Sequence, residues 1–251
     1  MKKFLLPVLF IALMITGCGS KESKTIPASD KVLTGKLSNG LTYYVRHNEE
    51  PKERASFYII QNVGAILEND DQNGLAHFLE HMAFQGTDNF PGKGIIQTLE
   101  RHGVSFGGNL NAYTAKNETV YNISSVPTTD VSLVDTCLLI LHDWSHYLTL
   151  SDEEIDGERG VISEEWRTRR NPSFRMGLQI NPVIYKDSQY AKRDVIGDLN
   201  VINNFEYQTL RDFYHDWYRT DLQAIAVVGD VDAEATVAKI NVRAYSCCGE
   251  P

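Results

Sequence analysis

The sequence predicts an α+β fold with one main domain. The first observation is a β-hairpin signal: two alternating segments, 31–37 and 41–47, are joined through Ser38, Asn39 and Gly40, and Asn-Gly is favoured in tight hairpin turns. The second is a series of segments with helical apolar spacing after residue 130. The third is the composition, with 42% hydrophobic and 23% charged residues among 251. This is ordinary for a globular chain that buries its own core.

The expected strands and helices follow one another without an internal repeat or linker. After the hairpin, 55–63 reads as a third strand, and Asn73-Gly74 precedes an amphipathic helix over 75–84. The further expected elements are helices over 92–102, 130–148, 151–170 and 207–218, strands over 108–113, 119–126 and 222–228, and a helix from about 232. Ser151 opens its helix as a capping box, and Asn171-Pro172 is expected to end it. Residues 31–242 are therefore expected to form one domain, followed by an atypical tail over 243–251.

The charge balance argues against nucleic acid as a partner. The formal net charge is -9, from 24 Lys and Arg against 33 Asp and Glu, whereas proteins that bind a phosphate backbone present basic surfaces. Four cysteines in 251 residues are too few for a disulfide scaffold. Cys137 lies in an apolar helical stretch and is expected in the core.

The N-terminus has the pattern of an export signal. Two lysines precede an apolar run over 4–15, which is shorter than the roughly 20 residues that span a bilayer. Residues 15–18 resemble a bacterial lipobox, which predicts a signal peptide over 1–17, lipidation of Cys18 and a polar tether over 18–30. The mature protein is then expected in the bacterial cell envelope, anchored to a membrane and facing the periplasm or lying at the outer membrane. The alternative is an ordinary signal peptide with an incidental cysteine.

The residues with the clearest chemistry lie on the helix after Gly74. His77 and His81 are four residues apart, so both imidazoles project from one helix face and can bind one Zn²⁺ at about 2.0–2.1 Å. Glu80 borders the same face, close enough to reach a metal-bound water, in the order His-x-x-Glu-His. The alternative is a core helix with two hydrogen-bonded histidines.

A second histidine pair serves as an internal comparison. His142 and His146 have the same spacing, with Asp143 between them. They lack the placed glutamate and lie away from the apolar side of their helix, so a solvated face is expected there.

Two histidines leave a zinc ion short of a third protein ligand. Glu158 and Glu165 are seven residues apart on the helix after Ser151, so they share a face, whereas Glu164 points about 100° away. Most charged residues on helices are simply solvated, and spacing alone does not single out Glu165.

Four segments carry a resemblance to a known family. They are GLAHFLEHM at 74–82, NAYT at 111–114, ERGVISEE at 158–165, and the stretch from Phe213 to Asp230. In this order they resemble the pitrilysin/insulinase-type zinc metallopeptidases, which include mitochondrial processing peptidase. The resemblance extends over roughly 32–238. It implies the catalytic half-domain of that family, an antiparallel or mixed sheet with helices packed on one face.

The resemblance also implies roles for individual residues. His77, His81 and Glu165 would bind one Zn²⁺ per chain, with Glu80 as the catalytic base. Glu158 would match the family's carboxylate beside the site. Asn111 and Ala112 would lie on the edge strand that holds the peptide by strand addition.

The expected function is that of a zinc-dependent metalloendopeptidase acting on unfolded peptides. A zinc ion with three protein ligands keeps a position for water, and Glu80 would take the proton from that water as it attacks the scissile carbonyl. The resemblance further implies a second half-domain or homologous subunit, so this chain alone is expected to bind zinc but to cleave poorly. The alternative is a lipid-anchored, non-catalytic peptide-binding or assembly subunit. A cytosolic lyase with the same reversed motif conflicts with the export signal.

Overall fold

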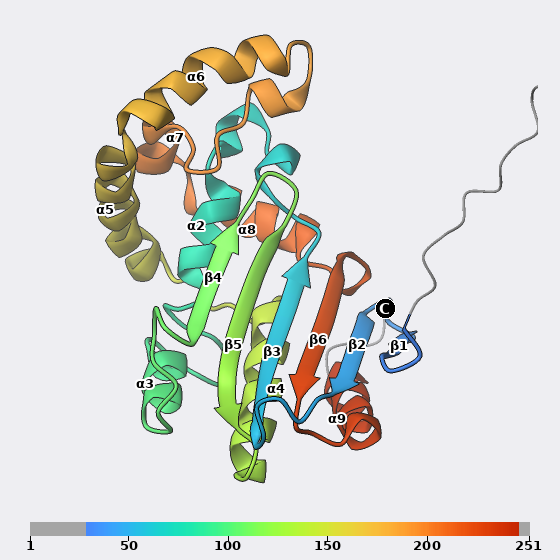
Figure 1. Ribbon diagram of the computed structural model, residues 1–251. Helices are drawn as coiled ribbons and strands as arrows, with labels where there is room; N and C mark the ends of the chain where they lie inside the picture. Colours follow the sequence, from blue (N-terminus) through green and yellow to red (C-terminus); the bar gives the residue numbers. More distant parts are fainter. Residues whose placement is uncertain (1–28, 246–251) are drawn as a thin grey trace, which may run out of the picture. The chain divides into compact units, whose positions relative to one another are not determined.

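A mixed sheet in the order β1-β2-β6-β3-β5-β4 organises the computed structural model, which describes residues 29–245 (Figure 1). The strands are β1 (Leu33–Lys36), β2 (Thr42–His47), β3 (Arg54–Gln61), β4 (Leu110–Thr114), β5 (Thr119–Pro127) and β6 (Gln223–Gly229). β2 and β6 are parallel, and the other neighbouring strands are antiparallel. The α+β prediction and the hairpin of β1 with β2 are confirmed.

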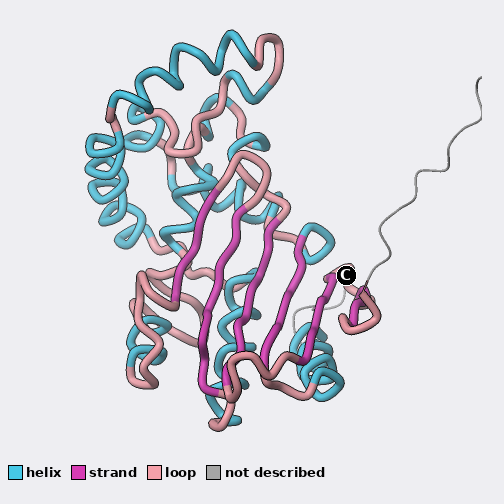
Figure 2. The backbone as a smooth tube through the Cα atoms, viewed as in Figure 1, coloured by secondary structure: helices cyan, strands magenta, loops and turns pink. Residues whose placement is uncertain are grey.

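The helices lie on one face of the sheet and at one of its ends. They are α2 (Leu75–Met82), α3 (Gly94–Glu100), α4 (Val131–His146), α5 (Asp152–Arg169), α6 (Pro172–Ile184), α7 (Leu199–Asn204), α8 (Tyr207–Trp217) and α9 (Ala233–Tyr245), with short 3₁₀ turns η1 (Ala65–Leu67), η2 (Asp70–Gln72), η3 (Gln189–Ala191) and η4 (Thr220–Leu222). Figure 2 shows them in cyan, with α4 and α9 behind the sheet. α2 and α5 lie beside the end of β4, and this places the histidine helix at the edge of the sheet.

The core fills the space between the sheet and α4. In β3, Phe57 and Ile59 are fully buried, whereas the alternate residues Tyr58 and Ile60 are half-buried on the other face. Trp144 of α4 stacks on Tyr121 of β5 with ring centroids 5.2 Å apart, and its indole N–H donates to the main-chain oxygen of Ala83 at 2.9 Å. Cys137 is buried in this core, as predicted. These contacts join the sheet to the segment that follows α2.

The structure contains two helices that the sequence analysis missed. Asn171 was expected to end the preceding helix, but its side chain also accepts a hydrogen bond from the Phe174 N–H at 2.9 Å and caps α6. Asp198 caps α7 in the same way. α6 contains Pro182 and has no buried residue, although Met176, Ile180 and Val183 have helical spacing and lie exposed.

Several predictions concern residues that the structure does not describe. The signal peptide over 1–17, the lipidation site Cys18 and nearly all of the tether over 18–30 lie outside the described residues. The tail expected over 243–251 overlaps α9 at its first three residues, and its remainder is also outside them. Among residues 29–245, no helix is both long and apolar enough to cross a membrane.

Candidate metal centre

The helix α2 presents both predicted histidines at one point. It starts after Gly74, whose φ of 108° lies in the left-handed region that suits glycine. The rings of His77 and His81 have centroids 4.7 Å apart, as expected for residues one helical turn apart. His77 is buried, and its Nδ1 has no hydrogen-bond partner in the described part of the chain. Its Nε2 is directed toward α5.

The carboxylate of Glu165 on α5 meets these two imidazoles. Its Oε2 lies 3.6 Å from Nε2 of His77 and 3.3 Å from Nε2 of His81. One potential ligand atom from each of the three residues lies within 4.8 Å of the others. Two imidazole nitrogens and one carboxylate oxygen form the donor set typical of a catalytic zinc site. The three side chains therefore fit one Zn²⁺.

The structure distinguishes Glu165 from its neighbour Glu164. Glu164 is exposed and forms a bidentate ion pair with Arg167, at 2.9 Å and 2.5 Å. Glu165 turns its Oε1 to the Arg169 guanidinium at 2.6 Å and its Oε2 to the histidines. The Glu165 position agrees with the predicted ligand set, whose role stays a prediction.

Glu158 holds His81 from the opposite side of its ring. Nδ1 of His81 donates to Oε1 of Glu158 at 2.7 Å, and the Gln85 amide donates to Oε2 at 2.6 Å. A buried carboxylate on the outer ring nitrogen fixes the orientation of a metal-binding histidine and raises its basicity. Sequence reasoning missed Gln85. Its signal was its position four residues after His81, in the turn that follows α2.

The two histidines have opposite pKa shifts. Burial lowers the pKa of His81, but its hydrogen bonds to Glu158 and Glu165 and the charges of both carboxylates raise it, and the net pKa is about 9. Burial, with the charge of His81, lowers the pKa of His77 to about 4. The hydrogen bond from His81 lowers the pKa of Glu165. Without metal at neutral pH, His77 is therefore neutral and His81 carries a proton.

The predicted base Glu80 lies between the histidines and the edge strand. The Thr114 hydroxyl of β4 donates to its Oε2 at 2.6 Å. Burial raises the pKa of Glu80, and this hydrogen bond opposes the rise. Sequence reasoning quoted Thr114 in the segment NAYT but gave it no role. Only the approach of β4 to α2 reveals the contact.

A groove of about 310 Å³ runs from Glu80, His81 and Glu158 to β4. It is lined by Glu80, His81, Phe84, Gln85, Lys93, Ile96, Phe106, Asn111, Ala112, Glu158 and Val161. β4 ends the sheet among the described strands. Asn111 and Ala112 are half-exposed on it, and the Asn111 amide donates to the main-chain oxygens of Gly107 and Gly108, each at 3.3 Å. The two predicted peptide-binding residues therefore lie beside the site, on a strand edge.

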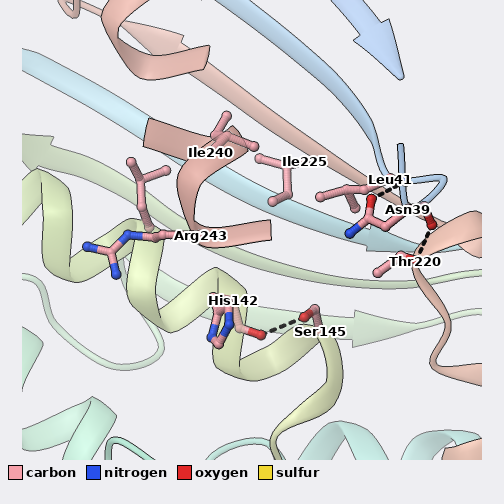
Figure 3. Close-up of a pocket in the computed structure, with 9 residues that line it drawn as sticks. Asn39, Leu41, His142, Ser145, Thr220, Ile225, Ile240 and Arg243 are labelled. Atoms are coloured by element: carbon pink, nitrogen blue, oxygen red, sulfur yellow. Dashed lines mark hydrogen bonds between the residues drawn. The ribbon is translucent and has the colours of Figure 1, made fainter. Parts of the chain in front are cut away.

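The second histidine pair does not form a solvated face. His142 is half-buried, stacks on Tyr147 with centroids 4.5 Å apart, and contacts Asp143 at 3.1 Å. It lines a separate pocket with Ile225 and Ile240 (Figure 3). His146 is exposed, yet its Nδ1 lies 2.9 Å from the main-chain oxygen of Tyr218. The expectation of a solvated side chain was wrong for His142, because the neighbouring Asp143 is fully buried and this side of α4 packs against the protein.

Comparisons with known proteins match the features of this site. A family model described as insulinase (peptidase family M16) matches residues 43–174, more than half of the chain. A model described as the peptidase M16 inactive domain matches residues 204–246. The first match contains α2, β4 and α5, which carry all the predicted site residues from His77 to Glu165.

Two similar proteins are named as probable zinc proteases. The probable zinc protease PqqL of Haemophilus influenzae is 38% identical over 240 residues, which cover 94% of this chain and 26% of that protein. PqqL of Escherichia coli is 36% identical over 222 residues, 88% of this chain and 24% of that protein. The chain thus spans about a quarter of these relatives.

Solved structures extend the comparison to the fold. The crystal structure of the first half of the periplasmic protease PqqL from Escherichia coli has a TM-score of 0.83 and 35% identity, covering 87% of this chain and 46% of that one. Pitrilysin shares the fold, with a TM-score of 0.72 at 22% identity, covering 88% of this chain and 24% of that one. The resemblance inferred from the motifs is confirmed, and the chain belongs to peptidase family M16, the insulinase family.

Proposed function

We propose that this chain is the N-terminal catalytic domain, over residues 31–242, of a zinc-dependent metalloendopeptidase that hydrolyses peptide bonds in unfolded peptides. The observation that carries the proposal is the meeting of His77, His81 and Glu165 within 4.8 Å. A carboxylate base, Glu80, and an open strand edge lie next to them. These are the parts that metal-assisted peptide hydrolysis needs.

The proposed mechanism divides the chemistry between the metal and the protein. When bound, zinc supplies a Lewis acid that polarises the scissile carbonyl and lowers the pKa of water to about 7. Glu80 takes a proton from the attacking water and passes it to the leaving amine. The Thr114 hydroxyl donates to its Oε2 and so orients this carboxylate. Glu158 keeps the His81 ring oriented through Nδ1.

The substrate is proposed to bind as an additional strand beside β4. An extended peptide can pair its main chain with the outer edge of a sheet, and β4 is the last strand in the described sheet. Asn111 and Ala112 are placed to contact that peptide next to Glu80. This pairing needs a peptide main chain with free N–H and C=O groups, which an unfolded segment supplies, so the proposed substrates are unfolded peptides.

Partners and location follow from the relatives and the N-terminus. We propose that a second half-domain or homologous subunit completes the enzyme, since the chain spans 24% of PqqL from Escherichia coli. That relative is described as periplasmic, and this agrees with an exported protein. Lipidation of Cys18, and hence a membrane anchor, is the finer part of the proposal.

Zinc content and cleavage of the same preparations test the function. The wild-type chain is expected to hold one zinc, His77→Ala to lose it, and Glu80→Gln to keep it. With a second half-domain supplied, cleavage of an unstructured peptide should fall by about 10²–10⁴ in Glu80→Gln, the usual effect of losing a general base. A wild type without zinc would refute the proposal. Zinc without any cleavage would favour the non-catalytic peptide-binding subunit.

A further inference from the structure

Glu68 is a buried carboxylate that contacts the start of the histidine helix. It lies between η1 and η2, nine residues before His77, and is 1% exposed. Its Oε2 accepts the Gly74 N–H and its Oε1 accepts the Ala76 N–H, both at 2.9 Å. The first N–H groups of a helix have no partner within the helix. Glu68 therefore caps α2 from outside the helix.

Glu68 supplies the side-chain cap that the N-cap residue of α2 cannot provide. A helix normally obtains its cap from the side chain of the N-cap residue, but here that residue is Gly74 and α2 has no N-cap side-chain bond. The geometry of the first turn thus depends on a residue six positions upstream of Gly74.

The position of the His77 side chain depends on the first turn of α2 more than that of His81 does. His77 is the third residue of α2, and its Nδ1 is buried without a hydrogen-bond partner among the described residues. His81 lies one turn later, and Glu158 holds its ring at 2.7 Å. Among residues 29–245, no side chain holds Nδ1 of His77 as Glu158 holds that of His81. Its position is therefore determined by the backbone that Glu68 caps.

The segment that carries Glu68 is itself held in place. The main-chain oxygen of Glu68 accepts the Arg193 Nε–H at 2.9 Å, and the same guanidinium pairs with Asp70 at 2.7 Å. Gly197 packs against Gly74 so closely that a Cβ on Gly197 would lie 2.4 Å from the Gly74 Cα. The cap is therefore part of a rigid arrangement.

Burial of Glu68 has an energetic cost that the two hydrogen bonds from the start of α2 partly offset. Burial raises its pKa to about 8, while the Gly74 and Ala76 hydrogen bonds and the charge of Arg193 oppose the rise. Both oxygens are used by α2, one for each N–H. A change at this carboxylate will therefore act first on the start of the helix.

We propose that Glu68 is a positioning residue of the metal centre, which holds His77 in its metal-binding position by capping the first turn of α2. The inference rests on the proposed zinc site, and it adds a residue outside the His-x-x-Glu-His helix. Sequence reasoning gave Glu68 no role, because no local pattern relates it to α2, which begins seven residues later, after η2 and Gly74.

The test compares two helix caps in the full chain. Glu68→Gln keeps the side-chain shape but offers one acceptor oxygen instead of two. Asp130→Ala removes the cap of α4, where Asp130 accepts the Ser132 and Leu133 N–H groups, and that helix carries no predicted ligand. The dissociation constant for Zn²⁺ is measured by competition with a chelator, and Tm is measured without metal.

Glu68→Gln is expected to weaken zinc binding about 10–100-fold, the usual effect of losing a residue that orients a ligand. Asp130→Ala is expected to lower Tm with no change in zinc affinity. If Glu68→Gln lowers Tm but keeps the wild-type affinity for Zn²⁺, the cap is purely structural and the proposal is overturned. A wild type that binds no zinc would overturn the proposed function together with this inference.

If Glu68→Gln does not fold, the shorter carboxylate of Glu68→Asp tests the positioning role instead. Glu68→Asp keeps the carboxyl group but cannot reach both N–H groups, so zinc binding is expected to weaken about tenfold, at the lower end of the range for residues that orient a ligand. Wild-type affinity in Glu68→Asp would then overturn the positioning role.

Discussion

Zinc binding by this chain is expected to be coupled to the loss of one proton from His81. A metal binds only the unprotonated imidazole. Because His81 has a pKa of about 9, the metal-free protein must release its proton at neutral pH. His77, with a pKa of about 4, is already neutral. The lowered pKa of Glu165 likewise leaves a carboxylate ready to bind.

The size of the coupling follows from the His81 pKa. With a pKa of about 9, the neutral fraction of His81 is about 0.1% at pH 6 and about 10% at pH 8. The raised pKa means that the proton competes with zinc at every pH below about 9, so affinity increases as the pH rises. The apparent zinc affinity is therefore expected to increase about 100-fold between pH 6 and pH 8, which is a slope of one on a logarithmic scale.

Chelator competition at several pH values measures this slope, with the chelator's own titration subtracted. Calorimetry in buffers of different ionisation enthalpy measures the protons released for each zinc bound. Glu158→Gln removes the carboxylate that raises the His81 pKa, so it should release less than one proton at pH 7. A wild-type affinity that does not change between pH 6 and pH 8 would refute the reasoning. A slope of two would mean that both histidines are protonated.

Three further predictions concern the third ligand, the core and the N-terminus. Glu165→Gln is expected to lower zinc affinity by 10-fold or more, about the effect of disturbing a ligand set, while Glu164→Gln should keep it; equal affinities in a chelator titration would contradict the assignment. Asp143→Ala leaves three donors from residues 87–89 without their acceptor, so the free energy of unfolding measured in urea should fall by about 3 kcal/mol. Cys18→Ala should shift the protein from the membrane to the soluble fraction, and a wild type that mass spectrometry shows without lipid would exclude the anchor.

Local patterns in the sequence were sufficient for most of the fold. The Asn-Gly turn, the alternating strands and the apolar spacing of α4 and α8 are signals carried by neighbouring residues. They failed for α6, because Asn171-Pro172 was interpreted as the end of one helix and is also the N-cap and first residue of the next. They also failed for His142, which stacks on Tyr147 and contacts the buried Asp143.

The sequence alone determined which residues share a helix face. The four-residue spacing of His77 and His81 places both rings on one side of α2 wherever that helix packs. Only the tertiary structure shows that the carboxylate of Glu165, and not that of Glu164, lies against these rings. It also shows that Glu68 accepts the main-chain N–H groups at the start of the helix. Helical periodicity fixes a direction around one axis, but contacts between elements depend on how separate segments pack, and that packing is not encoded in the spacing within either segment.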